Sequence, residues 1–259
     1  MGEQIFMADE EVLDCAIEAV KAASVVIRRD FRLPLRVRAE SAHDIKLETD
    51  VEAQAAIEKV ILDYFPGAQI VGEESEGNRV KDDDGVGVKW IVDPLDGTVN
   101  FSYRIPHFCV SVAAQVSRRV VCGVIYDPIR DELFTARLGK GAYLNGERIR
   151  VSERGDLSEA AISIGFARRV ETISHTLKLY EYYGLRVKKL RAMGAAALDL
   201  AYVAAGRLDA YMEQEVSWWD VAAGILLVQE AGGRVEWIER ANGKIQILAD
   251  SGHLDFRYR

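Results

Sequence analysis

The chain has little cysteine, no surplus of basic residues and no long apolar run, and each shortage excludes a class of protein. Its three cysteines, Cys15, Cys109 and Cys122, are too few and too scattered for a disulfide framework or a zinc site. Cys109 and Cys122 lie in apolar stretches, so we expect buried thiols in a reducing cytoplasm. No apolar run approaches the roughly 18 residues of a membrane-spanning helix, and none is expected.

Basic side chains are outnumbered by acidic ones. Against 41 aspartates and glutamates there are 33 lysines and arginines, and the net charge of −8 argues against nucleic acid as the main partner. A phosphorylated substrate is compatible with this balance, because bound metal ions invert the local field. The first nine residues are acidic and lack a signal-peptide pattern. We therefore expect a cytoplasmic protein whose main partners are neither membranes nor nucleic acids.

The first part of the chain is predominantly helical in pattern. A capping box, Thr49-Asp50-Val51-Glu52, is expected to open its second helix. Apolar spacing and turn residues predict this order of elements: a helix over 9–31, a polar stretch over 36–46 with strand pieces at most, a helix from 49 to the Pro66-Gly67 stop, a strand over 69–71, and a mobile charged loop over 76–87.

Strands, and then alternating strands and helices, follow in the rest of the chain. The expected strands are 110–116, 120–126, 132–136, 161–164, 185–190, 208–212, 234–238 and 245–249, and the expected helices are 171–183, 195–205 and 217–231. Gly139 to Gly146 looks superficially like a nucleotide-binding loop, but no helix follows it and Asn145-Gly146 is a hairpin turn. The pattern predicts an α/β (α+β) protein with an N-terminal subdomain at 1–153 and a C-terminal α/β subdomain at 154–259.

The stretch over residues 90–101 carries the strongest chemical signal. Its first three residues form an apolar run that predicts a buried strand, and a proline then ends it in a stiff corner flanked by Asp93 and Asp96. Gly97 allows close approach of the backbone to a ligand, and the Gly97 and Thr98 amides are suited to a helix N-terminus that binds an anion. Hard oxygen ligands beside an anion site suggest Mg²⁺ and a phosphoryl group, although an ordinary polar turn explains the same residues.

Carboxylates recur at the ends of predicted elements: Asp50, Glu73, the Asp93 and Asp96 pair, and Asp220. Each has an ordinary structural explanation. Asp50 fits a first-turn acid favoured by the helix dipole, and Asp220 closes a second capping-box pattern that starts at Ser217. Glu73 fits a solvated turn. The residues alone therefore leave open whether these acids form one site.

Three motifs resemble, in sequence and in order, those of the inositol monophosphatase family. Its members are Mg²⁺-dependent, lithium-sensitive sugar-phosphate phosphatases. The motifs are Gly72-Glu73-Glu74-Ser75, the stretch from Trp90 to Phe101, and Trp219-Asp220-Val221-Ala222-Ala223-Gly224 followed by Glu230-Ala231-Gly232-Gly233. The resemblance spans nearly the whole chain, including Gly194-Ala195-Ala196-Ala197-Leu198. It implies a layered αβαβα sugar-phosphatase fold with the site between two subdomains, and a homodimer.

The resemblance also implies a metal centre of two or three Mg²⁺ ions. Glu73, Asp93 and the Leu95 carbonyl are expected to hold a first ion, and Asp93, Asp96 and Asp220 a second. Asp50 resembles the acid beside a weaker third position. The implied catalytic residues are Glu73, Thr98 and Asp50, and the implied substrate contacts are Asp96, Gly97, Thr98, Gly194, Ala195, Ala196, Glu213 and Asp220.

One departure from the family concerns the third metal position. Many relatives carry a lysine about eleven residues before the acid that corresponds to Asp50, where this chain has Ala39. Lys46 is nearby but at a different spacing. The occupancy of the third position, its charge balance and the potency of lithium are therefore open.

These features predict a Mg²⁺-dependent phosphomonoesterase that hydrolyses an inositol monophosphate of the myo-inositol 1-phosphate type with a metal-activated water. Thr98-Val99-Asn100-Phe101 resembles the inositol-phosphatase branch of the family more than its nucleotide branch. The alternatives are a fructose-1,6-bisphosphatase or dual-specificity sugar phosphatase, and then a histidinol-phosphatase. Arg168 and Arg169 either meet a second phosphate or flank a surface helix.

A partner-binding regulatory protein on the same fold is the alternative from a different class, because some bacterial relatives act with the transcription machinery. The presence of Glu73, Asp93, Asp96, Thr98 and Asp220 favours the enzyme, since a scaffold has no need of a full metal-binding set.

Overall fold

Two β-sheets, one of seven strands and one of five, organise the protein. The computed structural model describes residues 3–41, 44–74, 88–166 and 170–256. The loop predicted at 76–87 and the arginines Arg168 and Arg169 lie outside these residues. Within them, no helix combines the length and the apolar character needed to cross a membrane.

The seven-stranded sheet is built from consecutive strands. In spatial order they are β3 (Gln69–Gly72), β4 (Lys89–Asp96), β5 (Cys109–Val116), β6 (Arg119–Asp127), β7 (Glu132–Arg137), β8 (Gly141–Leu144) and β9 (Glu147–Ile149). β3 pairs with β4 in parallel, and all later pairs are antiparallel, which confirms the predicted meander. The turn at Asn145 and Gly146 has φ values of 50° and 85°, as a two-residue hairpin requires.

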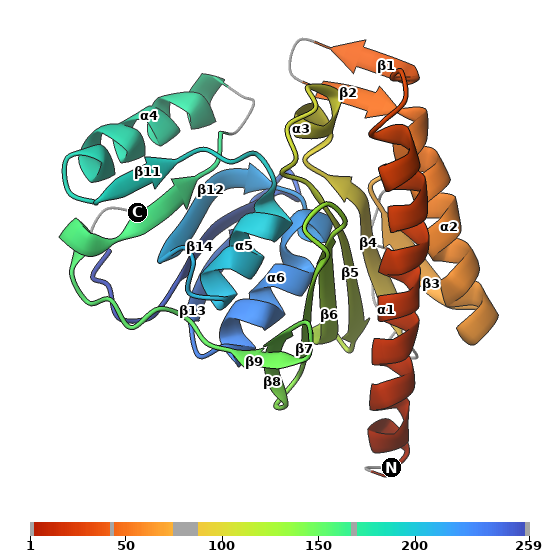
Figure 1. Ribbon diagram of the computed structural model, residues 1–259. Coiled ribbons are helices and arrows are strands. Elements are labelled where there is room, and N and C mark those ends of the chain that lie inside the picture. Colours follow the sequence, from red (N-terminus) through yellow and green to blue (C-terminus); the bar gives the residue numbers. More distant parts are fainter. Residues whose placement is uncertain (1–2, 42–43, 75–87, 167–169, 257–259) are drawn as a thin grey trace.

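Two long helices, α1 (Glu3–Asp30) and α2 (Glu48–Tyr64), cover one face of this sheet (Figure 1). Their apolar faces and those of the sheet form one core, in which Trp90, Phe101 and Phe108 are fully buried. Val110, Val112 and Ala114 of β5 alternate with Cys109 and Ala113, which face the other side of the sheet.

The other side of the seven-stranded sheet packs on a middle layer of two helices, α5 (Ala196–Ala204) and α6 (Trp218–Glu230) (Figure 1). These helices are apolar nearly all round because the second sheet covers their opposite side. A Cβ placed on Gly123 of β6 would lie 2.8 Å from the backbone oxygen of Ala223, so the α6 backbone rests directly on the sheet.

The five-stranded sheet has the spatial order β11-β10-β12-β14-β13. Its strands are β10 (Ala161–Ile164), β11 (Lys189–Arg191), β12 (Ala210–Val216), β13 (Arg234–Glu239) and β14 (Ile245–Asp250), and the 3₁₀ turn η1 (Leu157–Glu159) precedes them. Helix α4 (Val170–Gly184) packs on its outer side through Leu179 and Tyr183. The predicted αβαβα layering is thus confirmed, whereas the subdomain boundary at residue 153 stays a prediction.

Two local expectations were wrong. Residues 185–188 are not a strand, and β11 is limited to three residues; β12 begins at Ala210, two residues later than expected. The strand pieces allowed for the polar stretch after α1 form an antiparallel pair, β1 (Val37–Ser41) with β2 (Asp44–Leu47). These strands are short and polar, so apolar alternation could not reveal them.

The capping box expected at Thr49 was also wrong. Helix α2 is capped by Leu47, whose backbone N–H donates to the Asp50 carboxylate at 2.7 Å. Thr49 already lies in the first turn, and its hydroxyl donates to Asp30 at 2.9 Å. Asp50 therefore performs the acidic half of a capping box, without a Ser or Thr partner.

The strand that carries Asp93 does not end at the predicted corner. β4 continues through Pro94 to Asp96, and its register with β5 shifts between Asp93 and Asp96. A bulge tolerates proline because its unpaired residues need no ladder donor. The consequence is that both acids stay on one buried strand and are aimed by its bulge.

The close approach of α6 to β6 gives a stability prediction. We expect Gly123→Ala to destabilise the protein by about 1–3 kcal/mol, because the new methyl group overlaps the Ala223 backbone. Urea denaturation followed by circular dichroism measures this effect. Gly184→Ala is the matched control, since a Cβ there meets nothing within 4 Å. Equal stability of the two variants would show that the sheet and α6 are not in direct contact.

Candidate active site

Acidic side chains from three separate segments converge beside the bulge of β4. Asp93 lies on this strand with 1% of its surface exposed. Burial raises its pKa well above the usual range, and the negative charges of Glu73, Asp96 and Asp220 raise it further. These four acids are thus brought together from the end of β3, from β4 and from the start of α6.

Asp50 extends the acidic region toward α2. One of its oxygens accepts the Leu47 N–H, and the other, Oδ1, is buried without a hydrogen-bond partner in the structure. Burial raises the pKa of Asp50 to about 8 against the lowering effect of the Leu47 amide, and Glu73 and Glu74 raise it further. Asp50 therefore lies close enough to Glu73 to feel its charge.

Backbone amides hold the acids in place. Leu95 N–H donates to Asp93 Oδ1 at 3.0 Å, and Ser217 N–H donates to Asp220 Oδ2 at 2.7 Å. Asp220 is thus a helix cap, as its ordinary explanation held, and it also faces the acidic cluster. Asp220 can serve both the helix cap and the acidic cluster because a carboxylate has two oxygens.

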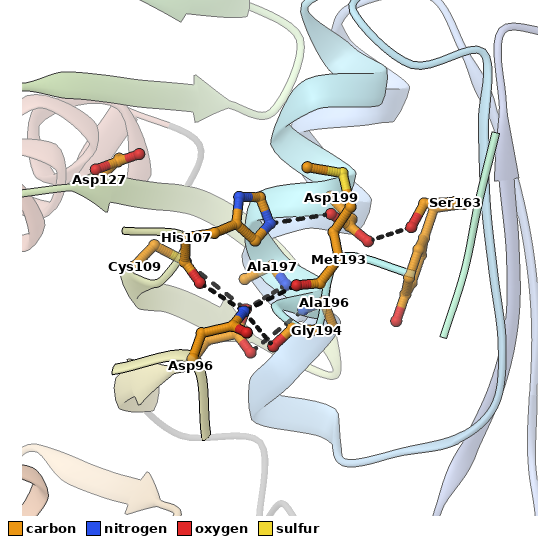
Figure 2. Close-up of polar contacts among 12 residues, drawn as sticks. Asp96, His107, Cys109, Asp127, Ser163, Met193, Gly194, Ala196, Ala197 and Asp199 are labelled. Atoms are coloured by element: carbon orange, nitrogen blue, oxygen red, sulfur yellow. Dashed lines mark hydrogen bonds and ion pairs between the residues drawn. The ribbon is translucent and has the colours of Figure 1, made fainter. Parts of the chain in front are cut away.

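Asp96 has the strongest anchor. Its Oδ2 accepts the Ala197 N–H at 2.7 Å and its Oδ1 accepts the Ala196 N–H at 3.2 Å, so the first turn of α5 binds both carboxylate oxygens (Figure 2). Burial raises the pKa of Asp96 to about 7, together with the charges of Asp199 and Glu73, although these amides lower it. The positive end of α5 thus partly compensates a buried acid.

The donor set fits a hard divalent cation. Buried carboxylates with raised pKa values and an orphaned oxygen on Asp50 need positive charge, and oxygen is the ligand that Mg²⁺ prefers. Across the described residues, no group of three or more aspartate, glutamate, histidine or cysteine side chains is arranged to hold a metal ion. The acids are gathered, but Asp93, Asp96 and Asp220 each turn one or both carboxylate oxygens toward backbone N–H groups.

The predicted phosphate contacts lie directly after β4. Gly97 has φ +91°, and Thr98 begins the short helix α3 (Thr98–Ser102), so the expected helix start is confirmed. Thr98 Oγ1 donates to the Leu95 carbonyl at 2.9 Å. A Cβ on Gly97 would lie 3.0 Å from the His107 carbonyl and 3.2 Å from Ala195 Cβ, so glycine is required by both conformation and space.

The predicted sugar contacts at residues 194–196 lie across from this turn. Gly194 has φ +80°, and Ala195 caps α5. The Asn100 side-chain amide donates to the Met193 and His107 carbonyls, both at 2.8 Å, and lies 3.4 Å from the Gly194 carbonyl. Asn100 thus connects α3 to the segment before α5, and Figure 2 shows these carbonyls beside Asp96.

Glu213 projects from β12, in the second sheet. Its Oε2 accepts the hydroxyl of buried Tyr211 at 2.5 Å. A Cβ on Gly165 would fall 1.8 Å from the same oxygen, so Glu213 occupies the space that glycine leaves. The predicted polyol acceptor is therefore held in one position.

Sequence reasoning missed a buried polar chain formed by His107, Asp199 and Ser163. Ser163 of β10 donates to Asp199 at 2.6 Å, and His107 Nε2 lies 3.4 Å from the other carboxylate oxygen (Figure 2). It joins the loop before β5, the middle helix α5 and the second sheet. The sequence signal for this chain was Asp199, a lone acid in an otherwise apolar helix.

A separate groove of about 500 Å³ lies on the outer side of the five-stranded sheet. Leu179, Trp237 and Ile238 are among its apolar lining residues, and Glu236 is its one acidic residue. It therefore lacks the convergent charged groups found at β4, and the acidic cluster is the better candidate for chemistry.

The chain is similar to known proteins in sequence and in fold. The family model described as the inositol monophosphatase family matches residues 8–254. An inositol-1-monophosphatase of Rhizobium meliloti is 40% identical over 92% of this chain and 88% of its own. The Escherichia coli K12 protein named Nus factor SuhB is 41% identical over 86% and 84% of the two chains.

Solved structures agree with these sequence matches. The extragenic suppressor protein SuhB of Bartonella henselae superposes with a TM-score of 0.84 at 36% identity, covering 93% of this chain and 94% of that one. The inositol monophosphatase of Anabaena sp. PCC 7120 gives a TM-score of 0.81 at 35% identity, with coverages of 98% and 93%.

The bridging position of Asn100 gives a second stability prediction. In Asn100→Asp, oxygens replace the donor that serves the Met193 and His107 carbonyls, and we expect a loss of about 1–3 kcal/mol. Urea denaturation measures the loss. Val99→Ala, at an exposed neighbour on α3, is the control and should stay within about 0.5 kcal/mol of wild type. A stable Asn100→Asp protein would contradict the bridge.

Proposed function

Because the chain belongs to the inositol monophosphatase family, we propose that it is a Mg²⁺-dependent phosphomonoesterase acting on an inositol monophosphate. Members of this family are metal-dependent phosphatases that act on phosphorylated substrates. The observation that carries the proposal is the buried convergence of Glu73, Asp93, Asp96 and Asp220, whose mutual repulsion calls for bound cations.

Within this proposal, the acids divide between two ions as the resemblance to the family implies. Glu73, Asp93 and the Leu95 carbonyl would hold one Mg²⁺, and Asp93, Asp96 and Asp220 would hold another. The Leu95 carbonyl retains a lone pair for this purpose, because Thr98 uses only one. Bound Mg²⁺ supplies charge neutralisation for the phosphate oxygens and favours water as the nucleophile.

The chain's own residues then position the reactants. The turn at Gly97 admits the phosphate close to the backbone, and glycine is required there. Thr98 commits its proton to the Leu95 carbonyl, so its oxygen is available as an acceptor that, with Glu73, orients the attacking water. The water attacks phosphorus in line and gives up a proton, the bond from phosphorus to the substrate alcohol oxygen breaks, and the leaving alkoxide takes up a proton to become the alcohol.

Substrate choice rests on the second sheet and α5. Glu213, fixed by Tyr211, is suited to accept a hydrogen bond from a ring hydroxyl. The Rhizobium relative named inositol-1-monophosphatase supports an inositol substrate. Fructose 1,6-bisphosphate and histidinol phosphate are the next candidates.

A second candidate is a role in partner binding, which the relatives named Nus factor SuhB favour at 41% identity. The net charge of −8 argues against direct RNA binding, so a protein partner is the form that this role takes. Affinity purification of an Asp93→Asn protein tests it: recovery of transcription factors by this variant would place partner binding ahead of catalysis.

Phosphate release across a substrate panel is the direct test of the enzyme. The panel consists of myo-inositol 1-phosphate, fructose 1,6-bisphosphate, histidinol phosphate and 3′-phosphoadenosine nucleotides. We expect myo-inositol 1-phosphate to be hydrolysed fastest, and no phosphate to be released from any substrate after chelation of Mg²⁺. Lithium should inhibit the reaction. Release from none of the four substrates would overturn the proposal.

Asp93→Asn separates catalysis from stability. The asparagine Oδ1 can still accept the Leu95 N–H, and the loss of one buried negative charge relieves repulsion among the acids. We therefore expect kcat/KM to fall on the order of 100-fold or more while Tm stays level or rises. Asp96→Asn should also lose most activity, but with a lower Tm, because asparagine offers one acceptor to the two amides of α5.

Asp63→Asn is the matched control for both variants, since this exposed acid pairs with Lys59 and lies near the C-terminal end of α2. It should leave activity unchanged. Near-normal turnover of Asp93→Asn at saturating Mg²⁺ would contradict the assigned role of this acid.

A further inference from the structure

Lys46 places a positive charge at the acidic edge of the site. Its Nζ lies 2.9 Å from Glu74 Oε1, and the two side chains are 42% and 10% exposed. Lys46 also acts on Asp50: burial, Glu73 and Glu74 raise the pKa of that acid, whereas the Leu47 amide and Lys46 lower it. One lysine thus faces both Glu74 and Asp50.

The position of Lys46 in the β1–β2 pair explains how it reaches this edge. The strands are antiparallel, and Ala39 of β1 is the direct partner of Lys46 of β2. Directly opposed residues of an antiparallel pair project their side chains from the same face. A lysine at position 39 would therefore rise from the same face as Lys46, one strand away.

The turn that carries Glu74 is fixed from the other side by α2. The Glu74 N–H donates to Gln54 Oε1 at 3.1 Å, and a Cβ on Gly72 would lie 2.6 Å from the same oxygen. The backbone of this turn is therefore held against α2 while its carboxylate is paired with β2. Lys46 acts on a carboxylate whose location is already set.

We propose that Lys46 is the charge-setting residue of this edge: from β2 it neutralises Glu74 and keeps a cation beside Asp50 weakly held. This inference rests on the proposed function, since it concerns the outermost ion of the metal centre. A fixed positive charge near an acidic site weakens cation binding by direct repulsion and by removing the attraction of the acid it pairs with. A weakly held ion exchanges readily with the solvent.

The test is Mn²⁺ binding to the full chain without substrate, measured by isothermal titration calorimetry. We expect Lys46→Ala to bind its weakest ion about threefold to tenfold more tightly than wild type, the size expected for one partly screened charge. The double variant Ala39→Lys with Lys46→Ala should return to within about twofold of wild type. This rescue tests position-specific charge, which a merely structural role of Lys46 would not restore.

Lys59→Ala is the control, because it removes the same charge from an exposed side chain paired with Asp63. Unchanged Mn²⁺ affinity in Lys46→Ala, an equal gain in Lys59→Ala, or failure of the double variant to reverse the gain would each overturn the proposal. Any of these three results, obtained while wild type binds Mn²⁺, would leave the proposed phosphatase function standing. Absence of Mn²⁺ binding by wild type would overturn both.

Discussion

Repulsion between buried carboxylates is the constraint on which the site depends. Asp93 is almost completely enclosed, and three further acids act on it. Ionised acids in such a place are costly unless opposite charge or hydrogen-bond donors stabilise them. The fold provides donors from the backbone, and the remaining demand for positive charge is the reason for proposing a metal centre here rather than a structural network.

The donors to Asp96 come from a segment that is distant in the sequence. Asp96 receives the amides of α5, which begins about a hundred residues later, and Asp220 completes the cluster from α6. The middle helix layer, which contributes these residues to the site, is packed between the two sheets. The apolar character of α5 and α6 and the direct contact at Gly123 are therefore linked to the geometry of the acids.

Polar contacts connect the layers around this centre. Asn100 joins α3 to the segment before α5, and Asp199 joins α5 to Ser163 of the second sheet. At the outer edge, Lys46 pairs with Glu74. The charge of the cluster is thus moderated on its inner side by helix amides and on its outer side by a lysine, which leaves the central acids with the strongest need for cations.

The sequence by itself determined the order of elements, and the motifs that resemble the inositol monophosphatase family implied the layered αβαβα fold and the grouping of the acids into one site. Apolar periodicity is a local property, and the motifs around Glu73, Asp93 and Asp220 are contiguous, so both are readable without coordinates. It misplaced the cap of α2 and ended β4 too early, because an aspartate can serve a cap without a Ser or Thr and a bulge can accommodate proline.

Only the tertiary structure decided which partners the site residues have. The grip of Ala196 and Ala197 on Asp96, the bridge from Asn100, and the buried Asp199 all depend on contacts between segments far apart in the chain. The same holds for Lys46, whose spacing from Asp50 in sequence conceals that it lies directly across a hairpin from Ala39. Strand register and helix packing set these contacts, and neither is encoded in the spacing of residues along one segment.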